Sequence, residues 1–400
     1  MNYGFVRVAA AVPELKIAGC SYNVQKISDL IKRAENTGVQ VVVFPELSIT
    51  AYTCGDLFHQ ELLLREAEAS LGKLAESMRD LKILAIVGLP LTVDNQLFNC
   101  AAVLQKGEIL GIVPKTYIPG YKEFYEERWF APGTNAVSSY VRLFGKDIPF
   151  GNDLLFESAE HGQVCFGIEI CEDLWAPVSP SSYQALAGAV ILFNLSASNE
   201  IIGKSGYRRD LVRMQSGKCI AGYVYASSGV DESTTDTVYG GHAMIAENGT
   251  ILAESERFVR ESHMVISEID IQNLKIERIK TTIFAETPST QSFRKIAFSL
   301  ELPEFDEKAA DRGKLVRYID PHPFVPSGKS ARDARCKEIF AIQTAGLAKR
   351  MIHTGMKHAV IGISGGLDST LALVVTVKTF DMLGIPRGNI TAVTMPGFGT

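Results

Sequence analysis

One glycine- and hydroxyl-rich loop in this sequence has the residue types that bind phosphate. It follows an apolar, β-branched run that predicts a buried strand over 358–363, and it precedes a predicted helix over 367–382. N–H groups at a helix N-terminus lack partners and favour an anion, and two glycines let the backbone approach phosphate oxygens. An ordinary strand-to-helix turn is the alternative, and no lysine of the common Gly-Lys-Ser/Thr loop is present. The loop reads Ser364-Gly365-Gly366-Leu367-Asp368-Ser369-Thr370.

A cysteine at the end of another predicted strand has the position of a nucleophile. Cys171 follows the predicted strand 164–170 and precedes Glu172 and Asp173. We expect backbone N–H groups at this turn to lower the thiol pKa, since the thiolate is the nucleophilic form. The flanking acids argue against burial of Cys171 in an apolar core. We interpret the other cysteines as small buried hydrophobic residues: Cys20, Cys54, Cys100, Cys165, Cys219 and Cys336.

A nucleophilic cysteine needs a base, and the carboxylates offer better candidates than the histidines. His161 lies on a polar stretch, whereas Glu46 follows a predicted buried strand over 39–44. Burial there would raise the pKa of Glu46 toward neutrality, as a base requires. Lys115 follows a third predicted strand and would stabilise a developing oxyanion. Taken singly, a Glu or Lys after a strand is more often a solvated edge charge.

The elements that position these residues form a mixture of helices, strands and antiparallel hairpins, with hairpin turns predicted at Lys106-Gly107-Glu108 and Glu247-Asn248-Gly249. Helices are predicted after residue 20 up to Gly38, over 61–80 and over 208–220. This pattern predicts two sheets packed together with helices outside, an α/β architecture that is not purely doubly wound. Strands are predicted over 5–12, 39–44, 83–89, 98–104, 109–113, 164–170, 190–195, 223–227, 243–246, 251–253 and 263–269.

The composition and the hydrophobic periodicity of the sequence change after Asp270. Residues 271–330 are more polar, less periodic and richer in proline, so we interpret them as a connector. A helix over 331–351 begins a second unit, in which the strand, loop and helix above are followed by a strand over 390–395. The predicted domains are therefore 1–270, the connector 271–330, and a second domain over 331–400.

Composition narrows the class of protein. The chain has 400 residues, 46% of them hydrophobic and 21% charged, which is ordinary for two or three folded domains. The net charge is −5 and no run of basic residues is present, so we do not expect nucleic acid as a partner. No apolar run reaches the length of a transmembrane helix. Seven widely spaced cysteines without a Cys-x-x-Cys pair argue for a reducing cytoplasm and against structural zinc.

Three short motifs resemble the catalytic motifs of the nitrilase, or carbon–nitrogen hydrolase, superfamily, in the same order. The resemblance covers 1–270 and implies an αββα sandwich with a Glu–Lys–Cys triad. It implies that Cys171 attacks an amide carbonyl, that Glu46 shuttles protons and that Lys115 holds the oxyanion. The motifs are Phe44-Pro45-Glu46-Leu47, Pro114-Lys115-Thr116-Tyr117 and Ile170-Cys171-Glu172-Asp173.

The glycine-rich loop is similar to the pyrophosphate loop of the N-type ATP pyrophosphatases, which have a Rossmann-like parallel α/β domain. A nitrilase-like domain followed by this loop resembles the family of glutamine-dependent NAD synthetases, and the stretches 48–57 and 119–130 agree with it. The resemblance places ATP against Gly362, Ile363, Ser364, Gly365, Gly366, Leu367, Asp368 and Ser369. It places glutamine against Tyr121, Glu172, Ser198 and Lys204.

The resemblance also implies a reaction with two sites. Glutamine hydrolysis at Cys171 supplies ammonia, which travels inside the protein and amidates deamido-NAD that ATP has adenylated. Mg²⁺ is expected with ATP, no separate metal ligands are expected, and a homo-oligomer is expected. The family's synthetase domain is longer than 331–400, so we expect a fragment that keeps glutamine hydrolysis and lacks NAD synthesis.

Other functions remain open at this point. A plain amidase or nitrilase, or a glutamine amidotransferase with another acceptor, would use the same triad, but the phosphate loop disfavours the plain hydrolases. An RNA-modifying ATP pyrophosphatase is disfavoured by the acidic balance. A non-catalytic interaction protein is disfavoured because Glu46, Lys115 and Cys171 are all present.

Overall fold

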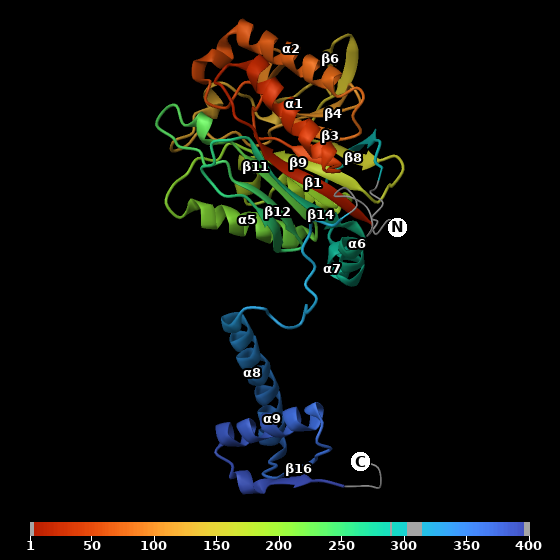
Figure 1. The fold of residues 1–400 in the computed structure, drawn as a ribbon, viewed down its shortest axis with the longest axis vertical. Coiled ribbons are helices and arrows are strands. Elements are labelled where there is room, and N and C mark those ends of the chain that lie inside the picture. The colour runs from red at the N-terminus through yellow and green to blue at the C-terminus, as the bar shows by residue number, and fades with distance from the viewer. Residues whose placement is uncertain (1–3, 289, 302–313, 396–400) are drawn as a thin grey trace. The chain divides into compact units, whose positions relative to one another are not determined.

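The computed structural model describes residues 4–288, 290–301 and 314–395 (Figure 1). The chain divides into two compact units, residues 1–318 and 319–400, and each is described by itself. No helix in the described ranges is both long enough and apolar enough to cross a bilayer.

The first unit contains a six-stranded sheet in the order β14-β1-β2-β3-β4-β5. The pairs β1–β2 and β2–β3 are parallel, whereas β14 and the β3–β4–β5 meander pair antiparallel. Parallel and antiparallel pairs therefore share one sheet, as predicted. The strands are β1 (Phe5–Val12), β2 (Val41–Val43), β3 (Leu84–Val93), β4 (Gln96–Gln105), β5 (Glu108–Pro114) and β14 (His263–Asp270).

The second sheet has seven strands in the order β13-β12-β11-β10-β9-β8-β15. Its centre is parallel, because β10 pairs in parallel with both β9 and β11. The strands are β8 (Leu154–Ser158), β9 (Cys165–Ile170), β10 (Ile191–Ser196), β11 (Gly222–Ser227), β12 (Ala243–Glu247), β13 (Thr250–Glu254) and β15 (Arg294–Phe298).

Helices cover the outer face of each sheet (Figure 1). Along β1, Val6 and Val8 belong to the apolar cluster between the sheets, whereas Ala9 and Ala11 belong to the cluster beneath α1 and α2. Successive strand residues point to opposite faces, so one strand serves two core layers. The predicted αββα sandwich is confirmed. The helices are α1 (Cys20–Asn36) and α2 (Glu61–Ser77) on the first sheet, and α3 (Glu172–Trp175), α4 (Pro180–Leu186) and α5 (Lys204–Cys219) on the second.

Two hairpins were predicted from turn residues, and both form. Lys106 and Gly107, with φ of 49° and 82°, join β4 to β5, and Asn248 and Gly249, with φ of 44° and 81°, join β12 to β13. Positive φ at both central positions is the geometry that matches the strand twist in a two-residue hairpin. The short hairpin of β6 (Tyr140–Leu143) and β7 (Lys146–Pro149) was not predicted.

The described residues of 271–318, within the predicted connector, contain regular structure. They form α6 (Ile271–Lys280) and α7 (Thr282–Glu286), and β15 pairs in parallel with β8 at the edge of the second sheet. Arg317 forms two hydrogen bonds of 2.7 Å to the carboxylate of Glu247. These elements are short, so their apolar periodicity is too brief to recognise in the sequence.

The second unit has the predicted start of a parallel βαβ arrangement. The strands β16 (Ala359–Gly362) and β17 (Ile390–Val393) pair in parallel, with α9 (Leu367–Leu383) between them in the sequence. The long helix α8 (Lys329–Thr354) precedes them and ends at Gly355, whose φ is 70°. Glycine tolerates this left-handed conformation, so it is the expected residue after a helix.

Candidate active site

The three predicted catalytic residues leave the ends of three different strands. Glu46 lies three residues after β2, Lys115 directly follows β5, and Cys171 directly follows β9. Hydrogen bonds show that they converge. The Glu46 and Cys171 N–H groups donate to the carbonyl oxygens of Ser196 and Leu195, which are neighbours on β10, and Lys115 Nζ donates to Glu46 Oε1 at 2.6 Å. The fold therefore brings residues from both sheets to one site.

The Glu46 segment passes unusually close to β3. A Cβ atom on Gly88 would lie 2.2 Å from the Leu47 nitrogen and 2.8 Å from the Glu46 carbonyl carbon. The Glu46 N–H donates a hydrogen bond of 3.3 Å to the carbonyl oxygen of Ser196, at the end of β10. Only glycine at 88 leaves space for this path, which ties the base-bearing segment to the second sheet.

A buried ion cluster surrounds Lys115. Its Nζ lies 2.6 Å from Glu46 Oε1, and 2.8 and 2.7 Å from the two carboxylate oxygens of Glu126. All three side chains are at most 1% exposed. Asn99 donates a hydrogen bond of 2.7 Å to the same Glu46 oxygen, and the Tyr52 hydroxyl donates one of 2.8 Å to Glu126. One lysine is thus held between two carboxylates.

The electrostatics of the cluster suit a proton-accepting Glu46. Burial raises the pKa of Glu46 to about 7, with Lys115 opposing the shift and Glu126 adding to it. The expected direction is confirmed. Burial disfavours a charged Lys115, but Glu126 and Glu46 outweigh this and raise its pKa well above the usual range. Glu46 Oε2 has no hydrogen-bond partner among the described residues, so this oxygen is available to a proton.

Cys171 is buried and its backbone is strained. Its φ of 45° and ψ of −95° lie outside the regions that residues with a Cβ prefer, and this costs about 1–3 kcal/mol. The side chain packs in the apolar cluster between the sheets, so the expectation that flanking acids keep it out of such a core is wrong. Burial, followed by Glu46, raises the thiol pKa, so the expected lowering is also wrong.

Outside this site, five of the other six cysteines are buried as expected, and Cys336 on α8 is exposed. The interpretation of Cys336 as a buried hydrophobic residue is therefore wrong. Cys336 is exposed because few positions of α8 are buried, and all of these lie toward the C-terminal end of the helix. No group of three His, Cys, Asp or Glu side chains that could hold a metal exists in the part of the chain that is described.

A cavity of about 440 Å³ opens onto Cys171. The four predicted glutamine contacts, Tyr121, Glu172, Ser198 and Lys204, all line it. The Tyr121 hydroxyl donates a hydrogen bond of 2.7 Å to Glu172 Oε1, which joins two segments of the lining. The cavity and the predicted contacts therefore coincide.

Two lysines line this cavity, and Lys204 is the partly buried one, whereas Lys122 is exposed. Lys204 is the first residue of α5, and its Nζ donates a 2.5 Å hydrogen bond to Asn199 Oδ1. The ammonium lies 5.4 Å from the ring centroids of both Phe124 and Trp175. Among the described residues its Nζ forms no ion pair within 4.0 Å, although Glu123 and Glu200 attract its charge from farther away. Burial lowers the pKa of Lys204, so a carboxylate brought by a ligand would restore the missing charge partner.

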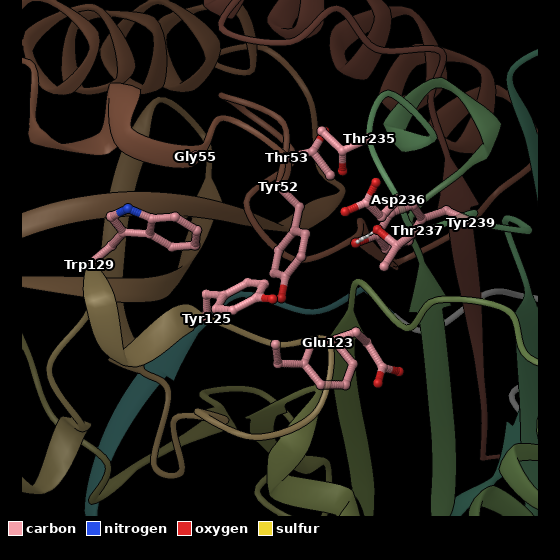
Figure 2. A pocket seen from close by; sticks show the side chains of 11 residues that line it. Tyr52, Thr53, Gly55, Glu123, Tyr125, Trp129, Thr235, Asp236, Thr237 and Tyr239 are labelled. Atoms are coloured by element: carbon pink, nitrogen blue, oxygen red, sulfur yellow. Dashed lines mark hydrogen bonds between the residues drawn. The ribbon is translucent and has the colours of Figure 1, made fainter.

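A second cavity of about 310 Å³ lies on the other side of the 123–124 segment, which lines both cavities. Figure 2 shows Trp129 and Tyr125 at one side of this cavity, the 235–239 segment at the other, and Tyr52 between them. Because the Tyr52 hydroxyl bonds Glu126, the second cavity is separated from the ion cluster by one side chain. Its lining contains aromatic, hydroxyl and carboxylate side chains.

Glu126, Asn99 and Tyr52 belong to the cluster but were not predicted. Glu126 lies in the stretch 119–130, where it is flanked by exposed acids and bases. Its burial at 1% exposure distinguishes it, and no periodic pattern marks that burial in the sequence. Asn99 falls within a predicted strand, where a polar residue in an apolar run is a usable signal. Tyr52 carries no comparable signal.

The glycine-rich loop of the second unit connects β16 to α9 as predicted. Gly365 has φ of 84°, and Gly366 is the residue before the first turn of α9. Residues 364–368 are exposed, and the Gly366 N–H donates a hydrogen bond of 3.3 Å to Ser364 Oγ. The hydroxyls of Ser369 and Thr370 bond back to the Gly366 carbonyl oxygen, at 3.1 and 2.9 Å. This geometry can accept an anion at the N-terminus of a 17-residue helix.

Comparisons with known proteins agree with both units. The model of the carbon-nitrogen hydrolase family matches residues 7–276, and that of the NAD synthase family matches residues 339–400. A glutamine-dependent NAD(+) synthetase of Mycobacterium bovis is 40% identical over the whole chain, and one of Thermotoga maritima is 28% identical over 94% of it. The chain spans 58% of the length of each of these relatives.

Solved structures show the same fold. A glutamine-dependent NAD(+) synthetase from Cytophaga hutchinsonii covers 94% of this chain, and the match covers 52% of that chain, with a TM-score of 0.59 at 22% identity. A nitrilase-superfamily amidase from Nesterenkonia covers 69% of this chain, and the match covers 97% of the amidase, with a TM-score of 0.52 at 18% identity. Because the carbon-nitrogen hydrolase model matches more than half of the residues, the chain belongs to the carbon-nitrogen hydrolase family.

Proposed function

We propose that this protein hydrolyses glutamine and supplies the ammonia for ATP-dependent amidation of deamido-NAD to NAD. Glutamine hydrolysis is supported by the buried cluster of Glu46, Lys115 and Glu126. This cluster lies beside Cys171, which lines the same cavity as Lys204. The identity of the curated relatives supports the amidation of deamido-NAD.

In the proposed first step, Cys171 Sγ attacks the side-chain amide carbonyl of glutamine. The thiol is protonated at neutral pH because burial raises its pKa, so its proton must leave as the carbon–sulfur bond forms. Glu46, with a pKa of about 7 and a free Oε2, accepts that proton. One Lys115 N–H is directed at Glu46 and one is shared by the oxygens of Glu126, which leaves a third for the oxyanion.

In the second step, the tetrahedral intermediate collapses. The carbon–nitrogen bond breaks, Glu46 returns the proton to the leaving nitrogen, and ammonia departs. Cys171 then holds a glutamyl thioester. Water, deprotonated by Glu46, attacks this thioester, and cleavage of the carbon–sulfur bond gives glutamate and the free thiol.

The cavity supplies groups that complement the amino-acid end of glutamine. We propose that Lys204 binds its α-carboxylate, because the ammonium has no carboxylate partner of its own. Glu172 provides a negative charge for the α-ammonium, and Tyr121 holds Glu172 in place. Ser198, 2% exposed and part of the wall, offers a hydroxyl.

We propose that the loop from Gly362 to Ser369 binds the phosphates of ATP. This proposal is supported by the left-handed conformation of Gly365, the exposure of residues 364–368 and the N-terminus of α9. Mg²⁺ often binds proteins through one or two carboxylates while substrate phosphates supply further oxygens. Asp368, the acidic residue in the first turn of α9, fits such a contact. We also propose a homo-oligomer that works in the cytoplasm.

Measurement of ammonia and glutamate tests the glutaminase half. The protein should release both from glutamine in equal amounts, and Cys171→Ala should release neither, whereas the buried control Cys165→Ala should keep its activity. Glutamine hydrolysis by Cys171→Ala would refute the assignment of the nucleophile. Failure of the wild-type protein to distinguish glutamine from simple aliphatic amides would favour the amidase alternative.

A further inference from the structure

Asp173 is a buried carboxylate close to the nucleophile, yet it does not line the glutamine cavity. It lies two residues after Cys171, on α3, and is 1% exposed. Its partners are backbone N–H groups. Oδ1 accepts a hydrogen bond of 2.8 Å from Tyr117, and Oδ2 accepts bonds of 2.9 Å from Ile170 and 3.3 Å from Thr116.

These three donors come from the two segments that carry the proposed catalytic groups. Thr116 and Tyr117 directly follow Lys115, and Ile170 directly precedes Cys171. The N–H of Lys115 bonds to Asn99 in the first sheet, at 2.8 Å, and the N–H of Cys171 bonds to Leu195 in the second, at 2.8 Å. Each segment is thus fixed to its own sheet, and Asp173 joins one segment to the other.

We propose that Asp173 is a positioning residue that sets the distance between Lys115 and Cys171. This inference rests on the proposed glutaminase function. The three N–H groups need acceptors on both oxygens, which an ionised carboxylate supplies and an amide does not, because the Nδ2 of an asparagine is a donor. A misplacement of about 1 Å between reacting groups can lower a rate by about 10²-fold, so this clamp acts on the chemical step.

The energetic state of Asp173 supports a specialised role. Burial raises its pKa to about 7, against the N–H groups of Ile170 and Tyr117, which favour the ionised form. An acid that served only to cap the short α3 helix could remain at the surface without this desolvation. Its burial between the segment after β5 and the end of β9 is explained if the link to the Lys115 segment is its function.

Asp173→Asn tests the proposal, with Glu169→Gln as the matched control. Glu169 is also a 1% exposed carboxylate, it lies on β9, and its bonds go to Tyr223 and to the Ser181 N–H. For Asp173→Asn we expect kcat for glutamine hydrolysis to fall by about 10²-fold while KM changes by less than about threefold. Glu169→Gln should keep kcat within about threefold even where its thermal unfolding temperature falls equally.

The opposite pattern overturns the proposal. Equal losses of kcat in Asp173→Asn and Glu169→Gln, or an Asp173→Asn variant that keeps its kcat, would show that the carboxylate serves stability alone. Should Asp173→Asn fail to fold, Asp173→Glu keeps the charge and both acceptors but lengthens the link by one methylene. We expect its kcat to fall by about tenfold or more, and an unchanged kcat refutes the clamp.

Alkylation of Cys171 by iodoacetamide separates this inference from the proposed function. Peptide mass spectrometry distinguishes Cys171 from the exposed Cys336. Displacement of Lys115 removes a charge that favours the thiolate, so Asp173→Asn should slow alkylation of Cys171 about tenfold relative to Glu169→Gln. A wild-type protein without glutaminase activity would refute the proposed function. Equal alkylation rates of Cys171 in the two variants would refute the role proposed for Asp173.

Discussion

Substitution of Glu126 by glutamine should move the pH dependence of glutamine hydrolysis to lower pH. In the wild-type protein burial raises the pKa of Glu46, the proposed base, to about 7; Lys115 opposes this shift and Glu126 adds to it. The base form exists above that pKa, so kcat/KM should rise as the pH rises through about 7. Glu126→Gln removes one negative charge near Glu46 and therefore lowers the pKa of Glu46.

The magnitude follows from the geometry of the cluster. Glu46 Oε1 and Glu126 Oε2 lie 2.6 and 2.7 Å from the same Lys115 Nζ. At an effective dielectric constant of about 20, two unit charges about 5 Å apart, the largest separation these bonds allow, repel by roughly 3 kcal/mol. Such an energy corresponds to about 2 pH units, so the variant's rise in kcat/KM should centre near pH 5.

Mass-spectrometric measurement of glutamate formation between about pH 4 and pH 9 gives the profile of the free enzyme when expressed as kcat/KM. Glu127→Gln is the matched control, because Glu127 is adjacent in sequence but exposed. Its profile should coincide with that of the wild type. A Glu126→Gln profile that still rises near pH 7 would refute the reasoning and assign the titration to Asp173, whose pKa burial also raises to about 7.

Three further substitutions test the backbone and the cavity. Cys171→Gly should have a free energy of unfolding about 1 kcal/mol higher than that of Cys171→Ala, because glycine relieves the strain of the positive φ. Alanine is usually the more stable of the two residues, so urea denaturation of both variants tests this reversal. Gly88→Ala should lower kcat at least tenfold and destabilise the fold by about 1–3 kcal/mol, since its Cβ meets the Leu47 nitrogen at 2.2 Å. Gly206→Ala, which meets nothing within 4 Å, is the control, and equal effects of the two alanines would refute the steric argument. Lys204→Met should raise KM for glutamine about 10-fold or more and change kcat less, because a charged contact to the substrate is lost. An unchanged KM in steady-state kinetics would exclude the proposed contact with the substrate carboxylate.

The elements of the fold were predictable where a short pattern determines them. The β4–β5 and β12–β13 turns require two residues of positive φ, and Lys106-Gly107 and Asn248-Gly249 supply them locally. By contrast, β15 was missed because its place beside β8 depends on a partner about 140 residues earlier in the chain. Nothing within Arg294–Phe298 itself encodes that pairing.

The same distinction applies to the site. Glu46, Lys115 and Cys171 were predicted because each follows a recognisable strand and lies in a motif. Their protonation was harder to predict, and the expectation for Cys171 failed because its burial depends on both sheets packing around it. Local sequence can place a thiol at a turn, but the dielectric environment that sets its pKa is a property of the whole sandwich.

Glu126 shows why this distinction matters for the chemistry. The motifs alone would place Lys115 against one carboxylate, that of Glu46, and the two charges would cancel. With Glu126 bound at 2.7 and 2.8 Å, two carboxylates share one ammonium, and a full set of charges would leave a buried excess of one negative charge. Such an excess is costly in an apolar interior, and a proton on Glu46 removes it. The second glutamate therefore keeps Lys115 charged and raises the pKa of Glu46, and under the proposed mechanism this makes Glu46 a better acceptor for the proton of Cys171 than a single Glu–Lys pair would.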